Sequence, residues 1–215
     1  NGAGGFAAAA PIPVGHVPYG IAIADLNRDG KADLSVANQF AHSLSILFGD
    51  GTGSFSPAPG SPVPVGTAPS WVKAADLNRD GKLDLAATSQ GTDAVTILLG
   101  DGVGGFAPAP GSPVPVASDC VRPGHACGPT PLAVVDMNRD GRLDLVTGNI
   151  FTDNASVLLG DGSGGFSPAP GSPFAVGDGP FALAAADLNW DFRPDLAVTG
   201  YNSSDVTVLL NRPST

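Results

Sequence analysis

Glutamate is absent from this chain of 215 residues, and all 20 acidic residues are Asp. A solvated helical surface uses Glu freely, whereas tight loops that gather oxygen atoms around a hard cation use Asp. With only 10 Lys and Arg and a net charge of -10, the chain lacks the basic face that nucleic acid requires. No run of 18 apolar residues is present, so the sequence predicts no membrane span.

Cysteine is also scarce, with only Cys120 and Cys127. They lie seven residues apart, and the pair either closes a small disulfide loop or stays reduced. The absence of other thiols and the expected calcium loops favour an oxidising compartment, so we expect a secreted or extracellular protein with this disulfide. The chain begins without Met or a signal peptide, which indicates a processed or trimmed form.

Glycine and proline are plentiful instead, at 30 and 21 residues, and hydrophobic residues make up 42%. This composition is typical of many short strands joined by turns. A nine-residue pattern, Asp-x-Asn-x-Asp-x-x-x-Asp, starts at residues 25, 76, 136 and 187. The spacings are equal except where an insertion at 117–129 lengthens one of them. A period near 50 residues with only strand signals predicts the blades of a propeller.

Each repeat carries four expected strands, of which the outermost is rich in proline and therefore lies at a sheet edge. We expect an all-β, single-domain β-propeller over 1–215, with four four-stranded blades. Residues 1–14 copy the outer strand that the last repeat lacks, so we expect this segment to close the last blade. The alternative is half of an eight-bladed ring completed by a homodimer. The expected blade cores are 19–65, 70–116, 131–176, and 181–210 plus 1–14.

The repeated loops have the oxygen pattern of a calcium site, because alternate positions of a tight loop point their oxygens inward. An EF-hand is excluded, since its twelfth-position Glu is replaced by Val36 or Ala87 and the flanks are strands. A metal-free turn is the other alternative. In the fourth loop Phe192 stands where glycine is expected, so we expect three Ca²⁺ sites and leave the fourth open. Backbone carbonyls of Lys31, Lys82 and Arg142 are expected as further ligands. The expected side-chain ligands of the four loops are Asp25, Asn27, Asp29, Asp33, Asp76, Asn78, Asp80, Asp84, Asp136, Asn138, Asp140, Asp144, Asp187, Asn189, Asp191 and Asp195.

These loops and their β surroundings resemble the FG-GAP/VCBS repeat family, which includes the calcium-binding blades of integrin α-subunits and of bacterial secreted proteins and lectins. The resemblance covers essentially the whole chain. It implies that the calcium loops lie on one face of the disc and that ligands meet the opposite face. The family usually forms rings of about seven blades, which this chain does not encode.

Candidate ligand-binding residues are therefore those on the opposite face where the repeats disagree. Aromatic rings among polar groups suit a sugar or a peptide. Tyr19, Trp71 and Phe181 have the alternative role of filling the gaps between blades, and Lys73 that of lining a solvated channel mouth. The candidates are Tyr19, Phe40, His42, Trp71, Lys73, His125, Phe151, Phe181 and Tyr201.

No catalytic constellation is evident, because Glu is absent and the three histidines show neither metal spacing nor a nucleophile motif. We expect an extracellular, calcium-stabilised binding module that is lectin-like and binds carbohydrate. A protein-interaction or adhesion module is the first alternative, and an enzyme acting on polysaccharide is the second.

Overall fold

The computed structural model describes residues 4–116 and 128–212. Within these ranges the chain is almost entirely β, with one 3₁₀ turn, η1 (Gln90–Thr92), which confirms the expected all-β class. No helix in the described part of the chain is long and apolar enough to cross a membrane. Cys120, Cys127 and His125 lie outside the described residues.

The strands form four antiparallel sheets, which we call units 1 to 4, and the three inner strands of each unit form a simple meander. The register matches between units: Leu34 pairs with Ile23 and Leu47, as Leu85 pairs with Ala74 and Leu98. The inner strands are β1 (Pro18–Ala24), β2 (Asp33–Asn38) and β3 (Ser43–Gly49) in unit 1, β6 (Pro69–Ala75), β7 (Asp84–Ser89) and β8 (Ala94–Gly100) in unit 2, β11 (Pro129–Val135), β12 (Asp144–Asn149) and β13 (Asn154–Gly160) in unit 3, and β16 (Pro180–Ala186), β17 (Asp195–Gly200) and β18 (Asp205–Leu209) in unit 4.

The proline-rich outer strand is present in units 1 to 3 as two short pieces, both of which pair with the third strand. Proline cannot donate to a β ladder, so the strand is restricted to the sheet edge and is interrupted. A serine hydroxyl fills the interruption: Ser61 Oγ accepts from the N–H of Ile46 at 3.0 Å. The pieces are β4 (Phe55–Pro57) and β5 (Val63–Pro64), β9 (Phe106–Pro108) and β10 (Val114–Pro115), and β14 (Phe166–Pro168) and β15 (Phe174–Ala175).

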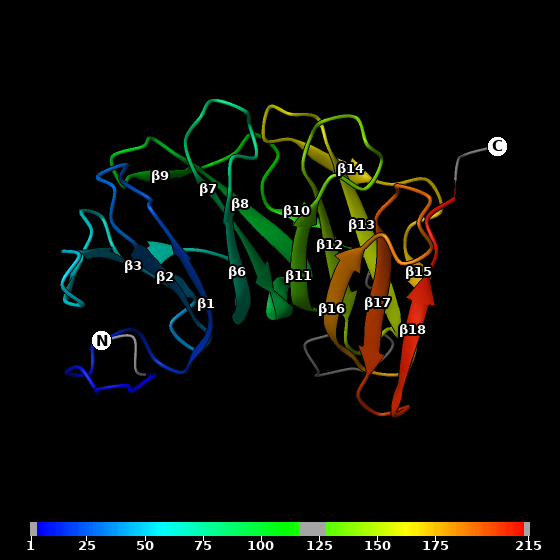
Figure 1. The fold of residues 1–215 in the computed structure, drawn as a ribbon, viewed down its shortest axis with the longest axis horizontal. Coiled ribbons are helices and arrows are strands. Elements are labelled where there is room, and N and C mark those ends of the chain that lie inside the picture. The colour runs from blue at the N-terminus through cyan, green and yellow to red at the C-terminus, as the bar shows by residue number, and fades with distance from the viewer. Residues whose placement is uncertain (1–3, 117–127, 213–215) are drawn as a thin grey trace.

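The apolar core lies between the units, in three clusters at three seams. At the first seam Leu44 and Ile46 of unit 1 pack with Val72 and Leu85 of unit 2, and all four are fully buried. β1, β6, β11 and β16 lie next to one another along the inside of the arrangement. The sheets thus follow one another as an open arc of propeller-like blades (Figure 1).

The structure differs from the expectation at the two ends of the arc. Unit 4 contains β16, β17 and β18 and gains no strand from the N-terminal segment. The described residues 4–17 form no strand and lead into β1, at the far end of the arc from β18 (Figure 1). The N-terminal segment therefore does not close the last sheet of its own chain, because units 1 and 4 are at opposite ends of the arc.

Candidate functional site

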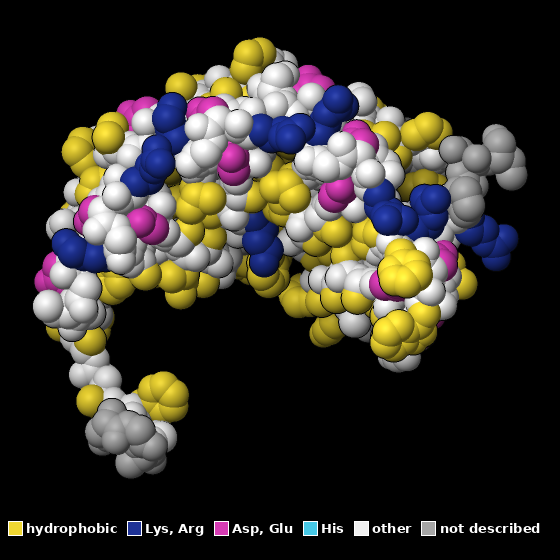
Figure 2. Space-filling model, turned by 45° about the horizontal axis from the view of Figure 1, so that its top comes forward, with side chains coloured by type: hydrophobic (Ala, Val, Ile, Leu, Met, Phe, Trp, Pro, Cys, Tyr) yellow, Lys and Arg dark blue, Asp and Glu magenta, His cyan; other side chains and the backbone are white. Residues whose placement is uncertain are grey.

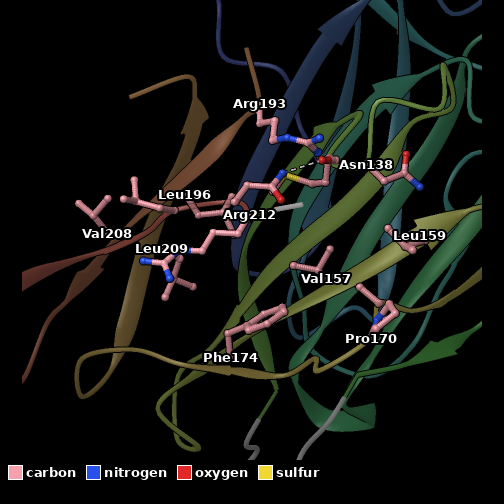
Figure 3. Close-up of a pocket in the computed structure, with 14 residues that line it drawn as sticks. Asn138, Val157, Leu159, Pro170, Phe174, Arg193, Leu196, Val208, Leu209 and Arg212 are labelled. Carbon is pink, nitrogen blue, oxygen red and sulfur yellow. Dashed lines mark hydrogen bonds between the residues drawn. The ribbon is translucent and has the colours of Figure 1, made fainter. Parts of the chain in front are cut away.

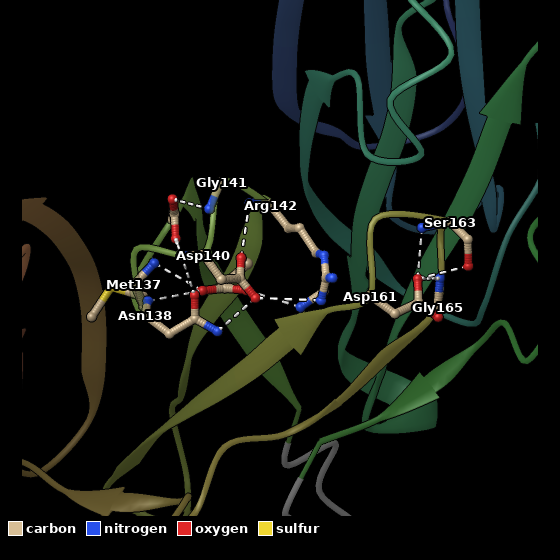
Figure 4. A network of polar contacts seen from close by, with 11 residues as sticks. Met137, Asn138, Asp140, Gly141, Arg142, Asp161, Ser163 and Gly165 are labelled. Atoms are coloured by element: carbon tan, nitrogen blue, oxygen red, sulfur yellow. Dashed lines mark hydrogen bonds and ion pairs between the residues drawn. The ribbon is translucent and has the colours of Figure 1, made fainter. Parts of the chain in front are cut away.

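The Asp-rich loops connect the first and second strands of each unit and are folded around their own backbone. In unit 1 the carboxylate of Asp25 accepts from the N–H of Asp29 at 3.0 Å and of Gly30 at 2.9 Å. Asn27 Oδ1 accepts from Asp29 N–H at 3.0 Å, and Asp29 Oδ1 accepts from Lys31 N–H at 2.9 Å. The loop of unit 3 repeats these bonds (Figure 4).

The ninth residue of each loop is a fully buried aspartate that anchors the loop to its sheet. Asp84 Oδ2 accepts from Leu77 N–H at 2.8 Å and Asn78 N–H at 3.2 Å, and Oδ1 accepts from Gly100 N–H at 2.9 Å. Burial raises the pKa of Asp84 and of Asp144, and these N–H donors partly oppose the shift. The carboxylate joins the start of the loop to the end of the third strand, a role that the repeat pattern did not indicate.

The fifth residue of the loop is exposed and is paired with the basic residue that follows it. Asp80 Oδ2 lies 3.2 Å from Lys82 Nζ, and Asp140 Oδ2 lies 3.5 Å from Arg142. The N–H of Lys82, helped by its ammonium and by Asn78, lowers the pKa of Asp80. Such exposed pairs add little stability. Acidic and basic side chains alternate along this rim of the molecule (Figure 2).

The fourth loop keeps the same backbone bonds with a different surface. Phe192 N–H donates to Asp187 Oδ2 at 2.8 Å, as the glycine N–H does elsewhere. Trp190 and Phe192 have φ of 63° and 66° and are 87% and 79% exposed. Arg28, Arg79 and Arg139 share the first of these conformations, but Phe192 replaces glycine at the second. The sequence pattern had not indicated that both aromatic rings would face solvent.

The loops offer only oxygen donors, which is the type that Ca²⁺ and Mg²⁺ prefer. Among the described residues, no three His, Cys, Asp or Glu side chains converge as a metal cluster. The remaining donors of the expected set are the Asn oxygen and a backbone carbonyl. The donor chemistry fits a hard cation, with side chains already turned toward the centre of the loop by its N–H groups.

The opposite edge of the arc, at the start of the first strands and the turns after the second, carries the exposed aromatic candidates. Phe40 is 60% exposed, and its ring lies 5.6 Å from that of His16 in a tilted arrangement. Phe181 and Tyr201, at 41% and 73% exposure, lie 5.9 Å apart. Tyr19 and Phe151 are 45% and 37% exposed. The structure therefore places one aromatic pair in unit 1 and another in unit 4.

Other candidates at this edge are used by the fold. Trp71 is partly buried and packs against the seam between units 2 and 3, as its alternative reading expected. His42 Nδ1 accepts from Ala68 N–H at 3.0 Å. Lys73 is exposed in the innermost strand of unit 2. A hydrogen bond of 3.2 Å between the amides of Gln39 and Gln90 also links units 1 and 2 here.

A groove of about 840 Å³ lies between units 3 and 4 and was not predicted (Figure 3). Unit 3 contributes Met137, Val157 and Leu159, and unit 4 contributes Leu196 and Val208. Asn211, which replaces the glycine found at residues 49, 100 and 160, donates to the carbonyl of Met137 at 2.7 Å. The interrupted repeat at residue 211 was the only sequence signal for this region.

Solved structures with a similar fold share little sequence with the chain. BBS1N in complex with ARL6DN aligns with a TM-score of 0.57 and 16% identity over 94% of this chain and 63% of that one. An auxiliary nutrient binding protein from Bacteroides ovatus aligns with a TM-score of 0.55 and 12% identity over 89% of this chain and 48% of that one. Virginiamycin B lyase from Staphylococcus aureus, solved with quinupristin, aligns with a TM-score of 0.51 and 18% identity over 91% of this chain and 53% of that one.

The chain thus spans about half to two thirds of the length of these structures, which support the β-propeller fold. A comparison with curated protein sequences finds no significant match. The FG-GAP-like repeat, in contrast, matches residues 25–87, 76–147 and 136–198, each match running from one Asp-rich loop past the next. These matches cover most of the chain and contain all four Asp-rich loops, so the chain belongs to the FG-GAP-like repeat family.

Proposed function

We propose that this chain is an extracellular binding module whose Asp-rich loops bind Ca²⁺ and whose opposite edge binds a ligand, carbohydrate in the first instance. The observation that carries the proposal is the separation of chemistry between the two edges. Carboxylates and amide oxygens are gathered in the loops, whereas two contacting ring pairs, His16 with Phe40 and Phe181 with Tyr201, lie at the other edge. The exposed rings of Trp190 and Phe192 in the fourth loop are the exception to this separation. A propeller uses its rigid sheets to hold such surface groups in place.

Calcium binding is supported by the conformation of the loops. In units 1, 2 and 3 the first, third and fifth side chains already accept N–H bonds from the same loop, which holds their oxygens on one short stretch of backbone. A bound cation would draw the carboxylates closer together, because the described residues contain no converged cluster of three such groups. Bound Ca²⁺ would neutralise carboxylates in a chain of net charge -10. Residues Asp25, Asn27 and Asp29 and their counterparts would hold it.

Carbohydrate binding is supported by the exposed aromatic side chains. Phe40 and Tyr201 are 60% and 73% exposed, and each has a second ring beside it. The face of a sugar ring stacks on such side chains, while neighbouring amides such as Gln39 and Asn202 offer hydrogen bonds to its hydroxyls. Asn202 is held in place by its bond of 3.0 Å to Asp178.

A protein ligand is the second candidate. The related fold of BBS1N is solved in complex with ARL6DN, so a propeller of this shape can present a surface to a protein. The same exposed rings would then serve as interface anchors. We propose no catalytic step, since the His16 ring lies against Phe40 and His42 accepts a backbone bond within the fold.

The proposal is tested on a glycan array probed with the full chain in Ca²⁺. We expect binding to specific glycans, and Tyr201→Ala and Phe40→Ala are expected to weaken it at least tenfold. Val103→Ala is the matched control, because Val103 is 71% exposed but lies in a turn of unit 2. An array without signal, combined with capture of a defined protein that the same two variants abolish, would replace the sugar with a protein ligand.

A further inference from the structure

We propose that the open side of unit 4 binds the open side of unit 1 from a second copy of this chain, with residues 4–14 of that copy forming the missing outer strand of unit 4. This junction would repeat the contacts of the internal seams. The inference goes beyond the proposed function and depends on neither calcium nor the ligand.

The open side of unit 4 exposes two valines at positions that are buried in every other unit. Val206 and Val208 are 59% and 50% exposed. Their counterparts in unit 1, Leu44 and Ile46, are fully buried against the first strand of unit 2. Leu210 is 46% exposed in the same row. Unit 4 therefore presents half of a seam, with the apolar residues of that half already in position.

The open side of unit 1 is the complementary half. Ile21 and Ile23 of β1 are 53% and 67% exposed. The counterparts of Ile21 are Val72, fully buried, and Leu132, 4% exposed, and each packs against the third strand of the unit before it. In the described structure no preceding unit packs on Ile21 and no following unit packs on Val208. A second copy supplies both.

The groove between units 3 and 4 indicates where the second copy's N-terminal segment would lie. At the seam between units 2 and 3, Phe166 from the turn of unit 3 packs on a cluster that includes Leu77 and Ile97. The corresponding residues Met137 and Val157 line the groove, and unit 4 has no phenylalanine at the position of Phe166 to pack on them.

Residues 4–14 contain that phenylalanine. Gly4-Gly5-Phe6 copies Gly164-Gly165-Phe166, and Ile12 and Val14 copy the apolar residues of the outer strand. Phe6 is fully exposed in this structure. In units 1 to 3 each outer strand pairs with the third strand of its own unit. In units 1 and 3 the next unit begins a few residues later, as unit 1 begins a few residues after 4–14. When unit 1 of the second copy docks on unit 4, residues 4–14 of that second copy therefore pair with β18 as the outer strand.

The turns give independent support for the same junction. Added side-chain atoms at Gly104 of unit 2 would collide with Phe48 of unit 1, whereas Gly53, its counterpart in unit 1, has nothing near it. Gly102 is flanked by Arg28 of the preceding unit, and Gly51 only by Lys31 of its own. The residues of unit 4 that would cover Gly51 and Gly53 are Trp190 and Leu210, and both are exposed.

The test is the mass of the full chain in solution by sedimentation, from low to high micromolar concentration. We expect about twice the chain mass of 21.3 kDa. Phe6→Asp disrupts residues 4–14 as an outer strand, and Val208→Asp places a charge on the open side of unit 4. Each variant is expected to have the mass of a single chain. Val103→Asp is the matched control, since it also places a charge on an exposed apolar residue, and it should leave the mass doubled.

Mixing the Phe6→Asp and Val208→Asp variants distinguishes association of two chains from closure of the ring within one chain. The Phe6→Asp chain keeps an intact unit 4, and the Val208→Asp chain keeps an intact N-terminal segment, so the mixture should form a pair with one complete junction. A single-chain mass for the unmodified protein at every concentration would overturn the proposal. So would a doubled mass that neither Phe6→Asp nor Val208→Asp reduces.

Discussion

Units 1 to 3 and unit 4 have nearly the same strand pattern and register, yet their side chains are in different surroundings. Val157 in unit 3 is 5% exposed, and its counterpart Val208 in unit 4 is 50% exposed. Leu77 in the second loop is 2% exposed, and Leu188 in the fourth is 46% exposed. A repeat of this kind therefore does not bury its own apolar residues. Burial is provided by the neighbouring unit.

The largest expected effect concerns the buried aspartate that ends each loop. Asp84→Asn places an amide donor against N–H groups in a buried site, and we expect the free energy of unfolding to fall by about 3 kcal/mol. Asp195→Asn in unit 4 should cost less, because the Asp195 carboxylate accepts two N–H bonds, from Leu188 and Asn211, whereas that of Asp84 accepts three. Urea denaturation of the two variants measures the difference. Equal losses would contradict the contrast between the units.

A matched pair of valines tests the seams directly. Val157→Ala removes buried methyl groups and leaves a cavity, so we expect a loss of about 2 kcal/mol. Val208→Ala removes the same atoms from a half-exposed site, and we expect a loss below about 0.5 kcal/mol when the chain is dilute. Chemical denaturation at low protein concentration is the measurement. A large loss at Val208 under these conditions would show that unit 4 is covered within one chain.

The sixth loop position provides a pair with opposite expected signs. Gly141 has φ of 82° and open space at its Cβ, so Gly141→Ala is expected to cost about 1 kcal/mol through backbone strain alone. Phe192 has φ of 66° and is 79% exposed, so Phe192→Gly is expected to stabilise by about 1 kcal/mol. Thermal melts of both variants test the signs, and destabilisation by Phe192→Gly would indicate that the ring has a contact in solution.

The smallest expected effect is on the pH dependence of the metal-free chain. Burial raises the pKa of Asp84 and Asp144 above 3.8, so their contribution to stability is complete below that value and is lost as pH rises through the folded pKa. The Thr52 hydroxyl and N–H lower the pKa of Asp50, and the N–H and hydroxyl of Ser163 lower that of Asp161. Those contributions are lost as pH falls below 3.8.

We therefore expect the melting temperature in EDTA to be highest just above pH 4 and to decline toward neutral pH. Melts between pH 3 and pH 8 in EDTA provide the measurement. A melting temperature that rises steadily across this range would contradict the assignment of Asp84 and Asp144 as the dominant buried carboxylates.

Much of the fold could be predicted from the sequence, because the loop pattern and the proline-rich edge strands determine local structure. The strands expected on either side of the Asp-rich loop at residue 25 are present as β1 and β2. The path of the N-terminal segment could not be predicted in this way. Its sequence indicates an outer strand but does not specify which sheet it joins, since that depends on the curvature of the whole arc.

The candidate site shows the same division. The spacing of the loop residues predicted a shared set of oxygen ligands, and their metal binding stays a prediction. The structure shows that Asp33 and its counterparts are buried anchors, with bonds to distant backbone groups such as Gly49 N–H at 2.9 Å. The exposure of Trp190 and Phe192 was missed, because a pattern of ligands does not show which side chains a missing neighbour leaves uncovered.

Calcium binding by the loops is tested most directly by titrating the full chain with Ca²⁺ in a calorimeter at neutral pH. Melting temperatures are then compared in Ca²⁺ and in EDTA. We predict that at least three ions bind and that the melting temperature falls by many degrees in EDTA, since each site at 100-fold excess over its Kd adds about 2.7 kcal/mol. Asp25→Ala should remove one ion and leave the others. No heat of binding and identical melts in Ca²⁺ and EDTA would contradict the proposal that these loops are calcium sites.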